Sequence, residues 1–143
     1  MSLKAILTNM IEAASDSPQR EIEVGIDDYQ VTDFSDAEIV KTGEVKRCVV
    51  IVGYSSHPLR GGIFHMTVFG NLQNWADLIS QNLVSDYTQI DIFGGDKVSW
   101  EKFSSLPSLL RQRGFTVHTD DALWTGKIIN NISLDNNGKI KVE

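Results

Sequence analysis

The chain has 143 residues, with 13 Lys and Arg against 19 Asp and Glu, for a net charge of −6. This acidic balance disfavours a nucleic-acid partner, because binding a phosphate backbone requires an excess of cations. The single cysteine excludes an internal disulfide and a Cys-rich zinc site. No apolar run approaches the roughly 18 residues of a membrane span, and no signal segment is visible. We therefore expect one cytoplasmic domain over residues 1–143, with delivery into a host cell left open.

Near the N-terminus the apolar periodicity changes from that of a helix to that of strands. Residues 2–14 carry apolar side chains at helical spacing, which predicts a helix that packs on the domain or serves as a docking element. Residues 20–34 alternate apolar and polar side chains instead. This alternation predicts a half-buried strand pair broken at Asp27-Asp28.

The middle of the chain predicts a central strand and a neighbouring one. Residues 47–53 form a nearly continuous apolar run, typical of a strand covered on both faces, and a loop over 54–60 leads to a strand over 63–69. The later predicted elements are a helix over 71–83, a strand over 88–93, a helix near 105–113, a short strand around 115–117 and a hairpin of 127–134 with 139–142. Their order predicts an α+β fold, a layered sandwich of mixed, mostly antiparallel β-sheet with about three helices.

The candidates for chemistry are a cysteine, a histidine and a threonine. Cys48 opens the apolar strand, so it is either a small core hydrophobe or a nucleophile. A nucleophilic thiol needs a base, and His65 lies on the predicted neighbouring strand, where it could equally be a core histidine. Thr42 either orients the imidazole or is a turn residue before a glycine. The residues alone leave these alternatives open.

The other histidines and the glycine pairs give weaker signals. His118 lies near Asp120 and Asp121, but no ligand spacing of a metal motif is present, and we expect no metal site. The glycine pairs at 61–62 and 94–95 are not followed by the Gly-Lys-Ser/Thr of a phosphate-binding loop.

Five short motifs occur in a fixed order between about Ile22 and Val142. They are Val24-Gly25 with Tyr29 and Val31, Thr42 followed by Cys48-Val49-Val50-Ile51, Gly61-Gly62-Ile63-Phe64-His65, Ile92-Phe93-Gly94-Gly95, and Gly126-Lys127 with the hairpin Asp135 to Val142. Together they resemble the bacterial chemoreceptor glutamine deamidases of the CheD family, and more distantly the Cys-His deamidase toxins of the cytotoxic necrotising factor type. The resemblance implies a single CheD-like domain, to which the helix over 2–14 is an addition.

The resemblance also implies an activity. It implies a hydrolase of chemotaxis that converts an exposed glutamine of a protein to glutamate and ammonia through a cysteine thioester. No cofactor is implied, and a regulatory protein partner is compatible with it. The implied residues are a catalytic triad of Cys48, His65 and Thr42, and a substrate-binding set of Lys46, Arg47, Gly61 and Gly62.

One departure from the family precedes the cysteine. The family usually has Gly-Ser there, whereas this chain has Lys46-Arg47. We expect these cations and His65 to favour the Cys48 thiolate, and the sulfur to lie within hydrogen-bond reach of the imidazole. Two alternatives stay open, a catalytically inactive CheD-like protein-binding module and a toxin-like effector deamidase.

Overall fold

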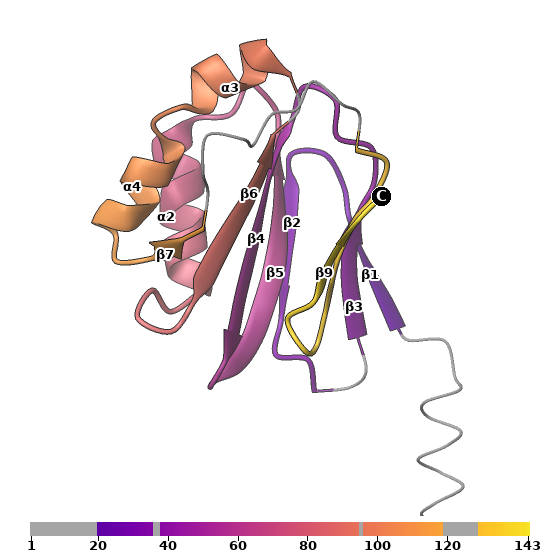
Figure 1. Ribbon diagram of the computed structural model, residues 1–143. Coiled ribbons are helices and arrows are strands. Elements are labelled where there is room, and N and C mark those ends of the chain that lie inside the picture. The colour runs from indigo at the N-terminus through magenta and orange to yellow at the C-terminus, as the bar shows by residue number, and fades with distance from the viewer. Residues whose placement is uncertain (1–19, 36–37, 95, 119–128) are drawn as a thin grey trace, which may run out of the picture.

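Two β-sheets pack face to face, and helices cover the outer face of one of them (Figure 1). The computed structural model describes residues 20–35, 38–94, 96–118 and 129–143. The predicted helix over 2–14, the Asp120-Asp121 pair, Gly95 and the Gly126-Lys127 motif lie outside these residues.

The first sheet has the strand order β1-β3-β8-β9. Its strands are β1 (Arg20–Val24), β3 (Glu38–Thr42), β8 (Ile132–Asp135) and β9 (Ile140–Val142). β1 and β3 run parallel, and the other two pairings are antiparallel. The predicted C-terminal hairpin is therefore confirmed, since β8 and β9 pair across a tight turn.

The second sheet has the order β2-β5-β4-β6-β7. Its strands are β2 (Asp28–Thr32), β5 (Leu59–Met66), β4 (Val49–Ser56), β6 (Gln89–Gly94) and β7 (Thr116–Val117). All its pairings are antiparallel except that of β6 with β7. The described helices are α2 (Leu72–Asn82), α3 (Lys97–Phe103) and α4 (Leu106–Gln112). The predicted α+β class is confirmed.

β4 lies at the centre of the second sheet and is buried on both faces. Val50 and Val52 point into the core between the two sheets. Val49 and Ile51 point into the core between the second sheet and the helices. A strand covered on both sides needs apolar residues at every position, which explains the unbroken apolar run. The prediction of a central strand is confirmed.

The predicted strand pair over 20–34 is wrong in one respect, because the two strands do not pair with each other. β1 belongs to the first sheet and β2 to the second. The chain crosses from one sheet to the other at residues 25–27, where Asp27 has a positive φ of 56°. Alternation identifies a strand with one buried face, but it does not specify the partner strand.

Three other features differ from the sequence-based expectation. Thr42 is the last residue of strand β3 and is therefore not a turn residue. The expected loop over 54–60 shrinks to the turn at His57-Pro58, because β4 continues to Ser56 and β5 begins at Leu59. Helix α3 was not predicted, because its seven residues are too short for a clear helical periodicity.

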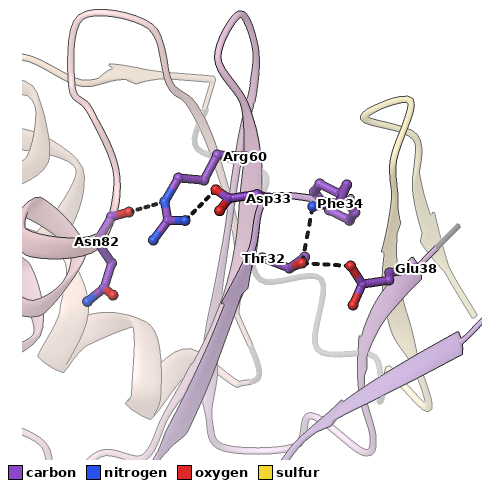
Figure 2. A network of polar contacts seen from close by, with 6 residues as sticks. All are labelled: Thr32, Asp33, Phe34, Glu38, Arg60 and Asn82. Carbon is purple, nitrogen blue, oxygen red and sulfur yellow. Dashed lines mark hydrogen bonds and ion pairs between the residues drawn. The ribbon is translucent and has the colours of Figure 1, made fainter. Parts of the chain in front are cut away.

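A polar network ties the layers together near the start of β5 (Figure 2). The Nε atom of Arg60 donates to the carbonyl of Asn82 at the end of α2, at 2.7 Å, and its guanidinium also binds Asp33. The hydroxyl of Thr32 donates to Oε1 of Glu38 at 3.0 Å, which links β2 to β3. Helices, second sheet and first sheet are therefore joined at this end of the sandwich.

Candidate functional site

The two sheets are bridged by a hydrogen bond between Thr42 and His65. Oγ1 of Thr42 lies 2.6 Å from Nδ1 of His65, and both residues are 1% exposed. Thr42 ends β3 in the first sheet, and His65 lies near the end of β5 in the second. The pairing of Val24 with Thr42 also lets the Thr42 hydroxyl reach the Val24 carbonyl, at 2.8 Å.

These two contacts fix the tautomer of His65. The Thr42 hydroxyl has one proton, which it donates to the carbonyl of Val24. Nδ1 of His65 must then carry the proton and donate it to Oγ1, which leaves the lone pair on Nε2. Nε2 is buried and has no hydrogen-bond partner among the described residues. A buried imidazole is thus held with its basic nitrogen unpaired.

Cys48 lies on the same face of the second sheet as His65. The register pairs Val50 with His65, and its extension by one residue beyond Val49, the first residue of β4, makes Cys48 the diagonal neighbour of the histidine, at about 7–8 Å between Cα atoms. The free thiol is half-buried and packs against the core between the sheets. The expected hydrogen bond is not formed in this structure, because Nε2 of His65 has no partner.

Burial favours the uncharged form of both groups. It raises the pKa of the Cys48 thiol, and the negative charge of Asp27 raises that pKa further. Burial lowers the pKa of His65, an effect that Asp27 partly offsets. The resting pair is therefore a neutral thiol beside a neutral imidazole, and the expected preference for thiolate is wrong.

Lys46 and Arg47 do not lower the pKa of the Cys48 thiol as expected, and each pairs with a carboxylate. Nζ of Lys46 lies 3.1 Å from Oε1 of Glu44. Nε of Arg47 lies 3.4 Å from Oδ2 of Asp96.

An open pocket of about 290 Å³ gives access to Cys48. Its lining consists of Ile26, Glu44, Lys46, Arg47 and Cys48. The two cations expected to contact a substrate therefore do lie beside the cysteine, although their role in binding stays a prediction.

The structure does not bring Gly61 and Gly62 to this pocket. A Cβ atom on Gly62 would lie 2.4 Å from the carbonyl oxygen of Gln30, and one on Gly61 would lie 2.8 Å from that of Gly53. Both glycines are needed for the close approach of neighbouring strands. This packing explains their presence without a substrate.

A larger cavity, of about 500 Å³, lies at the other end of the second sheet, with Arg60 and Arg113 in its lining. Both arginines are already bound, Arg60 as described above and Arg113 to Asp77 and Gln73. Its lining contains no His, Cys, Asp or Glu among the described residues, so it offers no acid–base pair. We therefore place the candidate site at Cys48.

No metal centre emerges from the described part of the chain. Its His, Cys, Asp and Glu residues form no group of three that could hold an ion. Nε2 of His118 instead lies 2.7 Å from Oε1 of Gln89.

Sequence reasoning missed two features of the site. The Val24 carbonyl, which sets the tautomer, depends on the parallel pairing of β1 with β3, and no local pattern signals that pairing. Asp27 was interpreted only as a break between strands, yet its charge acts on both Cys48 and His65. The two adjacent aspartates at a strand break were the available signal.

Comparisons with known proteins give distant structural neighbours. No protein-family model matches the chain, and no curated protein matches it. The Neisseria meningitidis protein NMB0706, of the family DUF152, is similar over 81% of this chain and 69% of its own, at 10% identity and a TM-score of 0.48. The Bacillus licheniformis hypothetical protein YfiH is similar over 76% of this chain, at 13% identity and a TM-score of 0.41. The match spans 60% of the YfiH chain.

The described helices are seven to eleven residues long. None of them, within the ranges that the structure covers, has the length and apolar character needed to cross a bilayer.

Proposed function

We propose that this protein is a cysteine-dependent deamidase that hydrolyses the side-chain amide of a protein glutamine, as the CheD family it resembles does. One observation carries the proposal. Thr42 holds a buried His65 by a 2.6 Å hydrogen bond, with Nε2 unpaired, on the sheet face that also carries Cys48. Nucleophile, base and orienting group are the three parts that such chemistry requires.

The first step is general-base attack from a neutral resting pair. As the sulfur of Cys48 forms a bond to the carboxamide carbon, Nε2 of His65 takes the thiol proton. The carbonyl electron pair moves onto oxygen, and Thr42 keeps the ring oriented through Nδ1. The raised thiol pKa and the lowered imidazole pKa favour this concerted transfer over a preformed ion pair.

The remaining steps return the site to its starting state. The oxyanion collapses, the carbon–nitrogen bond breaks, and the imidazolium of His65 gives its proton to the departing ammonia. His65 then takes a proton from water, which attacks the thioester carbon. The carbon–sulfur bond breaks, the proton returns to Cys48, and glutamate is released. The balance closes with water as the only co-reactant.

Exposed apolar side chains support a protein substrate. Ile26 lines the Cys48 pocket and is 63% exposed. Phe69 is 91% exposed and lies two residues after Thr67. The Thr67 hydroxyl and backbone N–H bind Asp27, which is the residue after Ile26. We assign these two exposed apolar side chains, linked through the Asp27–Thr67 contact, to a surface that contacts another protein.

A binding module without catalysis is the second candidate. Its support is the absence of a hydrogen bond from the Cys48 thiol to Nε2 of His65, together with the raised thiol pKa. In such a module, Cys48 would be a core residue that packs between the sheets.

The Cys48→Ser variant separates the two candidates. Wild-type protein is incubated with a bacterial chemoreceptor cytoplasmic domain, the substrate class that the resemblance implies, and glutamine-to-glutamate conversion is followed by peptide mass spectrometry. The deamidase proposal expects conversion by the wild type and only a small residual rate for Cys48→Ser. Equal conversion by both proteins would contradict it. The substitution is close in volume, so an unchanged Tm separates lost chemistry from lost folding.

A further inference from the structure

We propose that Asp27 is a positioning residue of this site, which fixes the end of β5 and supplies the negative charge that stabilises the imidazolium of His65. The role rests on the proposed deamidase chemistry, in which His65 becomes cationic when it accepts the thiol proton. Thr42 cannot offset that charge, because its hydroxyl is neutral. An anion elsewhere in the site can therefore supply the charge that the threonine does not.

The geometry of Asp27 is fixed by three contacts to Thr67. Oδ1 of Asp27 accepts from the Thr67 N–H at 2.9 Å, and the Thr67 hydroxyl lies 2.9 Å from both carboxylate oxygens. Thr67 follows the last residue of β5, two positions after His65. Asp27 thereby joins the crossing between β1 and β2 to the strand end that carries the histidine.

The charge of Asp27 acts on both members of the reacting pair. Burial lowers the pKa of His65 overall and raises that of Cys48; the charge of Asp27 opposes the first effect and adds to the second, so it favours imidazolium and disfavours free thiolate. This combination suits a thiol that stays protonated until His65 removes its proton during the attack. The raised thiol pKa therefore does not by itself argue against catalysis.

Other charged groups around the pocket are paired or bound locally. Glu44 pairs with Lys46, and Arg47 pairs with Asp96. Asp28 is the register partner of His65, yet its Oδ1 accepts from the N–H of the next residue, Tyr29, at 2.7 Å. Among the described residues, Asp27 is thus the carboxylate whose charge acts on both Cys48 and His65.

The Asp27→Asn variant tests the charge without removing the contacts. Asn adopts the left-handed backbone of this position readily, and its amide oxygen still accepts from Thr67. Cys48 is the only thiol, so iodoacetamide alkylation of the full chain, followed by intact mass as a function of pH, reports its titration directly. Ring-proton NMR follows His65, assigned by its loss in His65→Gln.

Both titrations should move to lower pH in Asp27→Asn. We expect a shift of about half a pKa unit, which raises the Cys48 alkylation rate at pH 8 about threefold. Asp28→Asn is the matched control, because it removes an adjacent negative charge, and it should leave both titrations unchanged. Should Asp27→Asn fail to fold, Asp27→Gly also tolerates the positive φ and should show the same shifts.

Two outcomes would overturn the role of Asp27. One is that the Asp27 variants titrate like the wild type. The other is that Asp28→Asn shifts both groups as much, which would mean a general loss of negative charge. Neither readout uses a substrate, so they fail independently of the deamidase proposal. Shifted titrations with an inactive wild type would refute the deamidase proposal but not the role of Asp27. An active wild type with unshifted titrations would refute the role of Asp27 but not the deamidase proposal.

Discussion

The Val24 carbonyl accepts the Thr42 hydroxyl proton at 2.8 Å, and this contact between two paired residues of parallel strands decides which nitrogen of His65 is basic. If the hydroxyl pointed elsewhere, it could donate to Nδ1 and leave the proton on Nε2. The backbone of the first sheet therefore sets the protonation of a side chain in the second.

Replacing Thr42 by Val tests this arrangement. The substitution keeps the shape but removes the hydroxyl, so Nδ1 of His65 and the carbonyl of Val24 both lose a buried partner. We expect a loss of about 1–3 kcal/mol in the free energy of unfolding, measured by urea denaturation, and a lower deamidation rate. Thr42→Ser keeps the hydroxyl and should retain most of both. Equal behaviour of the Val and Ser variants would mean that the hydroxyl has no such role.

The buried His65 also predicts a pH dependence of stability. Its folded pKa lies below the value of 6.5 of the exposed group, so below that pH the unfolded chain takes up a proton that the folded protein does not. Stability from this residue is complete at higher pH and is lost as the pH falls below about 6.5. Urea denaturation at pH 7.5 and 5.5 should show this loss in the wild type and a smaller one in His65→Gln. An identical loss in both proteins would show that His65 is not responsible.

Phe69 tests the proposed protein-binding surface. Phe69→Ser should raise the KM for a protein substrate several-fold, because it removes an exposed apolar side chain two residues after Thr67, which binds Asp27, while leaving Cys48 alkylation unchanged. Tyr87→Ser is the matched control, since Tyr87 is 60% exposed. It lies just before β6, whose first residue, Gln89, pairs with Tyr54 at the end of β4 that is far from Cys48. If both variants raise KM alike, Phe69 has no special part in recognition.

The sequence predicts strands better than it predicts their partners. The apolar run after Cys48 predicts a central strand and the Asp135–Gly138 turn predicts a hairpin, because both signals are local. The crossing of the chain between sheets at Asp27 is not a local signal, and neither is the parallel pairing of β1 with β3. These long-range features bring Thr42 to His65.

The candidate site was predictable to the same extent. The adjacency of β5, which carries His65, and β4, which begins one residue after Cys48, follows from their patterns and is confirmed by the register. The charge state of Cys48 was not predictable, because it depends on burial and on Asp27, whereas the neighbouring Lys46 and Arg47 suggest the opposite sign. Sequence neighbours are a poor guide to electrostatics when their own partners, Glu44 and Asp96, are not considered.

The central claim is that Cys48 and His65 act as one catalytic unit, and a double-variant comparison of kcat/KM tests it most directly. Ammonia release from the chemoreceptor domain is measured for wild type, Cys48→Ser, His65→Gln and the protein carrying both changes. When two groups act in the same step, removing either one abolishes the rate enhancement that they provide together. The kcat/KM of the double variant should therefore be no more than about threefold below that of the slower single variant. Losses that multiply in the double variant, or a single variant at the wild-type rate, would contradict the account.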